Sequence, residues 1–376
     1  MKRKIRMGMV GGGPGSFIGA AHRRAANLDG LIALVAGCFS GDPAKSAQTG
    51  RELCLDPSRV YPDYRTMFAE EAKRPDRIDF VSIVTPNSSH FAIAMAALEA
   101  GFDVMCDKPM TTTLDEAKQL RDKVRETGRL FCLTHNYTAY PMVREARQLI
   151  AGGELGTVRK VVAEYPQGWL AEAVTPDNKQ GLWRTDPAKA GRSCCMGDIG
   201  SHAANLTEYV TGLKITELCA DLAAVVPGRR LDDDGTVLLR FDNGARGVLM
   251  ASQVSVGEEN ALAIRVYGTK KALEWHQESP ETLIVKSNTG DQQVLRRNWA
   301  GRGAKWSRLP AGHPEGFFEA FGNLYSDMAR AIAAREAGEA YTSEFPTVDD
   351  GVRGMAFIAS VLAGAASADK WYKMEA

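Results

Sequence analysis

The strongest constraint on the fold is a regular alternation of short apolar runs and amphipathic stretches over the first 135 residues. Runs typical of buried strands recur along this part of the chain, at residues 5–10, 31–36, 78–84, 102–106 and 130–134. Strands that are separated by helices cannot pair as hairpins with their neighbours in sequence. The alternation therefore predicts a parallel sheet whose strands are joined by right-handed helical crossovers.

The pattern changes after about Tyr140, where a helical stretch leads into strands without helices between them. Strand-like runs occur at residues 158–165, 217–226, 236–241, 245–254, 261–267 and 272–275. Asp242-Asn243-Gly244 separates two of these runs and is a hairpin turn signal. We therefore expect this part to be α+β, with a largely antiparallel sheet, and the tail from Pro314 returns to helix.

Composition excludes several classes of protein. Lys and Arg together number 46, as do Asp and Glu, so the zero net charge does not favour nucleic acid or an anionic membrane as a partner. No apolar stretch approaches the roughly 20 residues that span a bilayer. The seven cysteines lack any C-x-x-C pair, and no group of ligand residues has metal-site spacing. We therefore expect a cytoplasmic protein with reduced thiols and no metal.

A glycine-rich loop at residues 11–19 follows the first predicted strand and precedes a helix. Glycines let the backbone turn tightly and approach a pyrophosphate, while the helix N-terminus supplies N–H groups and a positive dipole end. Ser16 stands where a strict G-x-G-x-x-G has its third glycine, unless Gly19 takes that place after a three-residue insertion. We predict that this loop binds a dinucleotide through Gly11, Gly13, Ser16, Phe17 and Ile18.

The end of the second predicted strand, where a ribose-binding acid is expected, reads Ala36-Gly37-Cys38-Phe39-Ser40. Nothing acidic there repels a 2′-phosphate, and Ser40 or Lys45 could contact one. The segment lacks the neighbouring arginine that would favour NADP. We therefore predict NAD as the cofactor and leave NADP open.

The two patterns together predict an α/β protein of two domains. A Rossmann dinucleotide-binding domain should occupy residues 1–138. A C-terminal α+β domain with a large, mostly antiparallel open sheet, for substrate binding and oligomerisation, should occupy residues 139–376. The C-terminal helices of this second domain could pack back on the first.

Three further segments make the assignment specific: Thr85-Pro86-Asn87-Ser88-Ser89-His90, Asp107-Lys108-Pro109, and Gly197-Asp198-Ile199-Gly200-Ser201-His202, which follows Trp183-Arg184. Together they resemble the glucose-fructose oxidoreductase/inositol dehydrogenase/MocA family over essentially the whole chain. The resemblance implies a Rossmann domain, a second domain whose open sheet often forms an oligomer interface, and an active site between the two. It also implies a homodimer or a homotetramer.

The resemblance also implies roles for these residues. Lys108 contacts the nicotinamide ribose and the reacting substrate oxygen, and Asp107 replaces the glutamate of the family's usual E-K-P. The nicotinamide-side loop is formed by Thr85, Pro86, Asn87 and His90. Asp198 and His202 match the D-x-G-x-H motif, and the pair Trp183 and Arg184 reaches the cofactor of the same or a neighbouring subunit.

The chemistry of the residues supports the same roles. Oxidation of a carbinol needs a group that takes the hydroxyl proton, which suits His202, and a cation such as Lys108 that holds the developing oxyanion. Asp198 and His202 are spaced i, i+4 and would share a face of a helix. The carboxylate could orient the imidazole, bind a substrate hydroxyl, or only cap a helix.

Other residues have a functional and a structural interpretation. Asn136 and Tyr137 end the Rossmann half and could bind substrate, and Trp169 could stack on a sugar or pack in a core. His90 could contact the cofactor or pack beneath it. No basic partner for Cys194 and Cys195 is evident in the sequence, and a turn at this place needs small residues, so we do not expect thiol catalysis.

The sequence therefore predicts an NAD(P)-dependent oxidoreductase that transfers a hydride between nicotinamide and a hydroxyl or keto carbon of a sugar, inositol or glycoside. One alternative is an NAD-dependent glycosidase that acts by transient oxidation and elimination. Another is a dinucleotide-binding sensor without catalysis, against which the presence of Lys108 and His202 counts.

Overall fold

The computed structural model describes residues 3–375, which form two compact units. Unit 1 contains the chain up to Thr111, then Asp115–Asn136, and later Phe317–Gly351. Unit 2 contains Thr112–Leu114, Tyr137–Gly316, and the chain from Val352 onward. The chain thus returns to unit 1 after it has formed most of unit 2.

Unit 1 is built on a five-stranded sheet of order β2-β1-β3-β4-β5, in which every pair of neighbours is parallel. The parallel sheet predicted from the alternating pattern is therefore confirmed. Its strands are β1 (Ile5–Gly11), β2 (Ile32–Cys38), β3 (Phe80–Val84), β4 (Asp103–Cys106) and β5 (Phe131–Leu133).

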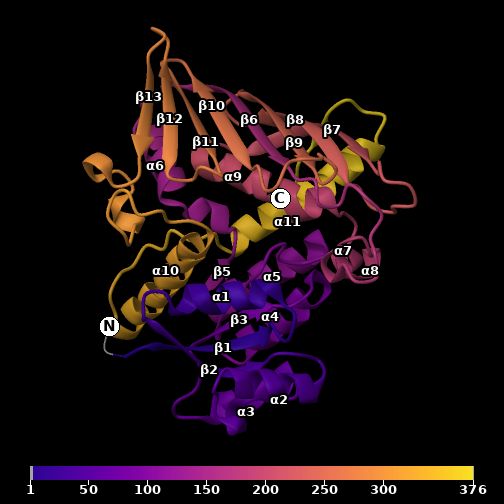
Figure 1. Ribbon diagram of the computed structural model, residues 1–376, viewed down its shortest axis with the longest axis vertical. Coiled ribbons are helices and arrows are strands. Elements are labelled where there is room, and N and C mark those ends of the chain that lie inside the picture. Colours follow the sequence, from indigo (N-terminus) through magenta and orange to yellow (C-terminus); the bar gives the residue numbers. More distant parts are fainter. Residues whose placement is uncertain (1–2, 376) are drawn as a thin grey trace. The chain divides into compact units, whose positions relative to one another are not determined.

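The strand order of unit 1 creates a switch point between β1 and β3. The connection from β1 runs to β2 on one side, whereas β3, β4 and β5 follow on the other, so right-handed crossovers place helices on both faces. Ligands of such sheets bind where the carboxyl ends of strands meet at the switch point. The helices are α1 (Phe17–Asn27), α2 (Pro43–Glu52), α3 (Tyr64–Lys73), α4 (His90–Glu99), α5 (Leu114–Thr127) and α10 (Phe317–Ala337), which packs on α1 (Figure 1).

Unit 2 is built on a nine-stranded sheet of order β13-β12-β11-β10-β6-β9-β8-β7-β14. Its neighbours are antiparallel except for β6 and β9, and the predicted hairpin at Asn243-Gly244 joins β8 to β9. The strands are β6 (Val158–Pro166), β7 (Ile215–Ala223), β8 (Asp234–Phe241), β9 (Arg246–Ser252), β10 (Ala263–Gly268), β11 (Lys271–His276), β12 (Thr282–Ser287), β13 (Gln292–Arg296) and β14 (Tyr372–Lys373).

Helices cover one face of this sheet. Helices α6 (Pro141–Ala151) and α9 (Ser201–Thr211) lie on the same side of it in Figure 1, and both contact its strands. Burial alternates along β8, where Val237 and Leu239 are buried while Thr236 and Leu238 are exposed. The remaining helices are α7 (Lys179–Arg184), α8 (Pro187–Ala190) and α11 (Val348–Ala366).

Several elements were not predicted from the sequence. In α3, Met67 and Phe68 are the buried apolar side chains, so the helix has only a narrow apolar stripe. Strand β13 is almost wholly exposed and β14 has two residues, so neither shows an alternating pattern. Each is held by pairing with a neighbouring strand, which local sequence does not record.

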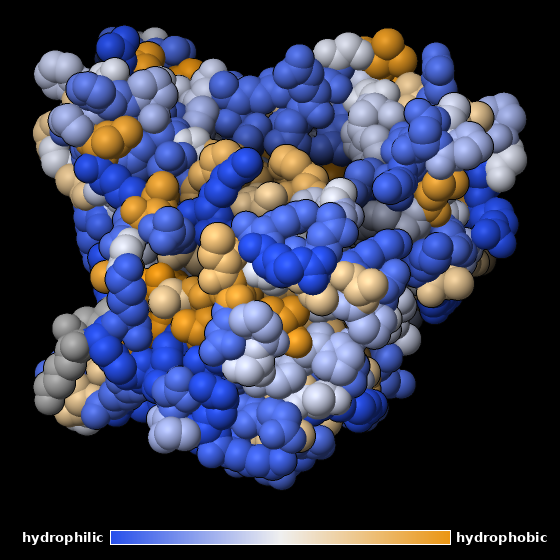
Figure 2. Space-filling model, turned by 60° about the horizontal axis from the view of Figure 1, so that its bottom comes forward, coloured by the Kyte–Doolittle hydropathy of each residue, from blue (hydrophilic) through white to orange (hydrophobic). Residues whose placement is uncertain are grey.

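No helix in the described part of the chain is long and apolar enough to span a membrane. The face shown in Figure 2 is mainly hydrophilic, with hydrophobic side chains gathered in patches.

Candidate active site

The glycine loop of unit 1 owes its shape to close backbone contacts. Gly11 and Gly12 have φ of +90° and +77°, a region in which a side chain is strained. A Cβ on Gly19 would lie 2.3 Å from the Cα of Gly12, and a Cβ on Gly13 would lie 2.6 Å from the Phe39 carbonyl oxygen. Gly19 therefore allows α1 to pack against the loop, as the third glycine of a loop with three extra residues would.

Ser16 is the N-cap of α1, and its Oγ accepts a hydrogen bond from the backbone N–H of Gly19 at 3.2 Å. Phe17 and Ile18 form the first turn of this helix, and Phe17 is 65% exposed. The predicted loop residues thus lie at a helix N-terminus that follows β1, which is an anion-binding arrangement.

An acidic residue, Asp42, lies shortly after the end of β2, where Ser40 and Lys45 were predicted to contact the cofactor. Asp42 caps α2 by accepting from the N–H of Ala44, its own N–H donates to Ser40 Oγ at 3.1 Å, and Lys45 Nζ lies 3.9 Å from its carboxylate. The carboxylate lies four residues beyond the last residue of β2, and its hydrogen bonds are those of a helix cap.

His90 connects the two loops that follow β3 and β4. Its Nδ1 lies 2.9 Å from the carbonyl oxygen of Pro109, and its Nε2 lies 2.8 Å from that of Thr85. The side chain is buried. Carbonyl oxygens only accept, so the ring satisfies both partners only when both of its nitrogens carry protons. His90 therefore ties the two predicted cofactor loops to each other.

Asp107 and Lys108 follow β4. Asp107 Oδ1 accepts from the Lys108 backbone N–H and from Thr134 Oγ1, both at 2.9 Å. Within residues 3–375 no other hydrogen-bond donor is bonded to this carboxylate, so Oδ2 is available to a ribose hydroxyl. Nearby His135 is neutral, because burial, and secondly the charge of Lys108, lower its pKa to about 3.

Asn136 lies just after β5 and is only 2% exposed. Its Nδ2 has no hydrogen-bond partner in the described part of the chain. An unsatisfied buried donor costs about 1–3 kcal/mol. A ligand oxygen at this edge of the sheet would remove that cost.

In unit 2, Asp198 and His202 lie on two kinds of helix. Asp198 is in a π-helical turn, Met196–Gly200, and buried His202 is in the first turn of α9. The prediction that both share a face of one regular helix is therefore wrong in detail. The buried carboxylate of Asp232 holds the turn by accepting from Ser193 Oγ and from the N–H groups of Cys194 and Met196, at 2.7–3.0 Å.

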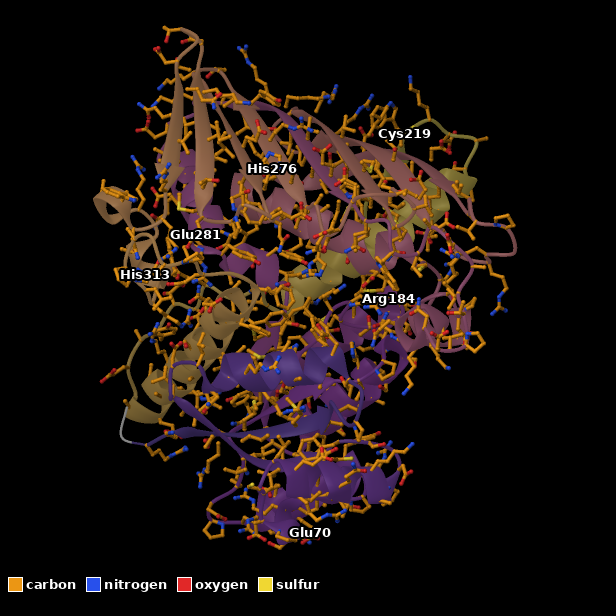
Figure 3. The ribbon with its side chains drawn as sticks, in the orientation of Figure 1. Glu70, Arg184, Cys219, His276, Glu281 and His313 are labelled. Atoms are coloured by element: carbon orange, nitrogen blue, oxygen red, sulfur yellow. The ribbon has the colours of Figure 1, made fainter. Side chains whose placement is uncertain are left out.

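The carboxylate of Asp198 is bonded to two side chains from other elements. Arg184 Nε donates to its Oδ2 at 2.8 Å, and Gln253 Nε2 donates to the same oxygen at 3.2 Å. Arg184, labelled in Figure 3, comes from α7 and lies over the rings of Trp183 and Trp169, at 4.2 and 5.6 Å from their centroids. The predicted pair Trp183 and Arg184 thus lies beside Asp198.

Cys194 Sγ lies 3.2 Å from Gln253 Oε1. Burial raises the pKa of Cys194 to about 12, so the thiol is a proton donor and not a nucleophile.

Two tyrosines flank His202. The ring centroid of Tyr137 lies 4.7 Å from that of His202 at an interplanar angle of 73°, and the centroid of Tyr165 lies 6.3 Å away. The two hydroxyl oxygens are 2.6 Å apart, and burial raises the pKa of both phenols. Both therefore remain neutral at physiological pH.

Sequence reasoning missed the residues that support these side chains in unit 2. They are Tyr165, Gln167, Asp232, Gln253 and Asn260. None lies in a motif, and no sequence signal marks them. Within the described residues, no group of three or more His, Cys, Asp or Glu side chains is placed to hold a metal.

Comparisons with known families cover most of the chain. The family described as "Oxidoreductase family, NAD-binding Rossmann fold" matches residues 5–135, and the "GFO/IDH/MocA C-terminal domain" matches residues 143–274. An uncharacterized oxidoreductase, YfiI of Bacillus subtilis, is 34% identical over 388 residues, which cover 100% of this chain and 98% of that protein.

Solved structures agree over the whole length. An inositol dehydrogenase homolog from Azotobacter vinelandii in complex with NAD⁺ is 38% identical, with a TM-score of 0.96 over 99% of this chain and 98% of that one. The same homolog in complex with NADH and myo-inositol is 37% identical, with a TM-score of 0.92 over 99% of this chain and 98% of that one. An oxidoreductase from Sinorhizobium meliloti is 46% identical, with a TM-score of 0.90 over 98% and 99%. The fold class and the NAD cofactor predicted from the sequence are confirmed.

Proposed function

This chain belongs to the Gfo/Idh/MocA family of NAD-dependent oxidoreductases, and we propose that it transfers a hydride between NAD and a hydroxyl or keto carbon of a sugar, inositol or glycoside. The observation that carries the substrate class is the buried, unpartnered Nδ2 of Asn136, which needs an oxygen acceptor at the strand edge that also bears Lys108. The Azotobacter homolog, solved with myo-inositol, supports a cyclic polyol.

The residues of unit 1 fit a dinucleotide. The loop around Gly13 has no room for a side chain and lies at the switch point, and Asp107 Oδ2 is open to a ribose hydroxyl. When bound, NAD supplies the carbon that accepts the hydride. Pro86 and Asn87, which begin the loop after β3, would lie on its nicotinamide side.

We propose one residue as the proton acceptor of the reaction and another as the group that stabilises the negative charge on the oxygen. His202 accepts the hydroxyl proton as the carbinol is oxidised, and the Lys108 ammonium stabilises negative charge on the oxygen. We further propose that Asp198, which Arg184 and Gln253 hold in place, accepts a hydrogen bond from another hydroxyl of the substrate.

We also propose that the protein is a homodimer or homotetramer through the face of the large sheet that α6 and α9 leave uncovered. Leu238, Val248 and Val162 lie side by side across three strands of that face, and Leu238 is 41% exposed. A row of apolar side chains on an open sheet is the kind of surface that a second copy buries.

The activity is tested by nicotinamide absorbance with NAD⁺ or NADP⁺ and a panel of inositols, monosaccharides and glycosides. We expect NADH formation with at least one polyol, and a loss of at least about 10³-fold in kcat/KM for Lys108→Ala. Glycoside cleavage without net formation of NADH would reject the dehydrogenase and show that the protein is a glycosidase that acts by transient oxidation and elimination. Tight NAD⁺ binding without turnover of any compound would make the protein a sensor.

A further inference from the structure

A chain of side-chain hydrogen bonds connects Trp169 to the tyrosines beside His202. Trp169 Nε1 donates to Gln167 Oε1 at 2.9 Å, and Gln167 Nε2 donates to Asn260 Oδ1 at 2.8 Å. Tyr165 donates to the same Asn260 oxygen at 2.6 Å, and Asn260 Nδ2 donates to Tyr137 Oη at 3.1 Å. All five residues belong to unit 2.

The indole fixes the direction of these bonds. An indole N–H can only donate, so the oxygen of the Gln167 amide must face Trp169 and its nitrogen must face Asn260. The oxygen of the Asn260 amide must then face Gln167. This leaves the Asn260 nitrogen as the donor to Tyr137.

The same reasoning places the two hydroxyl protons. Tyr165 has one proton, which is bonded to Asn260, so Tyr165 can only accept from Tyr137 across the 2.6 Å between their oxygens. Tyr137, Tyr165 and Asn260 therefore form a closed ring in which each residue donates to the next. Bonds that run in one sense polarise one another, and each is strengthened by about 10–30%.

This ring holds the two aromatic rings that flank His202. The Tyr137 ring is nearly perpendicular to the imidazole, at 73°, and the Tyr165 ring is tilted against it, at 59°. The backbone N–H of Asn260 donates to Glu278 Oε1 at 2.8 Å, which anchors the residue from which the ring is built. Without their hydroxyl bonds, both phenol rings could rotate away from the imidazole.

We propose that Asn260 and Tyr165 are positioning residues for His202, and that Trp169 sets the sense of their hydrogen bonds. This rests on the proposed function, in which His202 accepts the substrate proton. The indole is 40% exposed, so the outer end of the network is open to a ligand. A sugar ring that packs on Trp169 would thereby contact the residue that sets the sense of these hydrogen bonds.

The first test is Tyr165→Phe, which deletes one oxygen from the ring and keeps the aromatic surface. The matched control is Tyr267→Phe, which removes a hydroxyl from a partly exposed tyrosine on β10 of the same sheet. The change removes the bond that Tyr165 donates to Asn260 and the bond that it accepts from Tyr137. We expect kcat to fall at least about tenfold, with the KM for NAD⁺ unchanged. The pH profile of kcat should shift in Tyr165→Phe alone.

The second readout does not need turnover. The chain has six histidines, so ring ¹⁵N–¹H spectra are resolvable, and His202→Asn identifies the His202 signals. We expect the chemical shifts of His202 to change in Tyr165→Phe and, by a smaller amount, in Trp169→Phe. Trp169 lies nearer the surface, so Trp169→Phe provides the test if Tyr165→Phe does not fold stably. Unchanged His202 signals and an unchanged pH profile in both variants would overturn the proposal. Moved signals in a protein that oxidises no polyol would uphold the positioning role and reject the proposed function.

Discussion

The two units hold their candidate functional side chains by contacts of very different range. In unit 1, Ser89 and His90 bond to Thr85 four and five residues away, and the Lys108 N–H bonds to the adjacent Asp107. In unit 2, Asn260 bonds to residues 93 to 123 positions away. The contacts described for the first site join residues up to 27 positions apart, whereas those of the second are assembled across the large sheet. In the proposed function, and with the exception of Lys108, we expect substitutions at these sites of unit 1 to act on cofactor binding and those at the sites of unit 2 to act on the chemical step.

Within unit 2, the largest expected effect is at His202. His202→Asn removes the proposed proton acceptor, so kcat should fall by about 10² to 10⁴ while the Kd of NAD⁺, measured by fluorescence titration, stays within about twofold. His276→Gln is the control, because His276 is exposed on β11 of the same unit. If His202→Asn weakens NAD⁺ binding and leaves kcat unchanged, His202 acts on cofactor binding and not on the chemical step.

This difference in range explains what the sequence could predict. The glycine loop, Asp107-Lys108 and the parallel order of the strands follow from neighbouring residues, because backbone geometry and helix ends create them. The Asp198 and His202 motif could also be recognised. Its supports could not, since Asp232 and Asn260 reach the site only after β8, β9 and β10 have paired.

The next effect tests the support of the Asp198 turn. Asp232→Asn places an amide nitrogen among three donors that all need acceptors. We expect a loss of about 3 kcal/mol in the free energy of unfolding in urea, and a fall in kcat through displacement of Asp198. Asp221→Asn, at an exposed position of β7, should change neither the free energy of unfolding nor kcat. Equal stabilities of the two variants would show that the turn does not depend on Asp232.

A smaller effect concerns the pH stability of unit 1. Burial lowers the pKa of His22 to about 4, partly opposed by Asp107, and that of His135 to about 3. The unfolded chain takes up these protons near pH 6.5 and the folded chain does not, so the stability they contribute is present above pH 6.5 and is lost as pH falls toward 4.

The loss should approach about 1.4 kcal/mol per pH unit for each histidine. Urea unfolding at pH 7 and pH 5 measures it, and His22→Gln should reduce the pH dependence by about one proton. If His22→Gln has the wild-type slope, the buried imidazole is not the group that titrates.

The smallest effect concerns the link between the two cofactor loops of unit 1. His90→Gln can replace one of the two bonds to Thr85 and Pro109, whereas His90→Phe replaces neither. We expect the Kd of NAD⁺ to rise about tenfold in His90→Phe, for the net loss of about one hydrogen bond, and less in His90→Gln. Because the link lies within unit 1, the His202 spectrum should stay unchanged in both. If His90→Phe instead lowers kcat at saturating NAD⁺ with no change in Kd, the loops position the reacting groups rather than the cofactor. The contacts of unit 1 would then contribute to the chemical step, as the long-range contacts of unit 2 do.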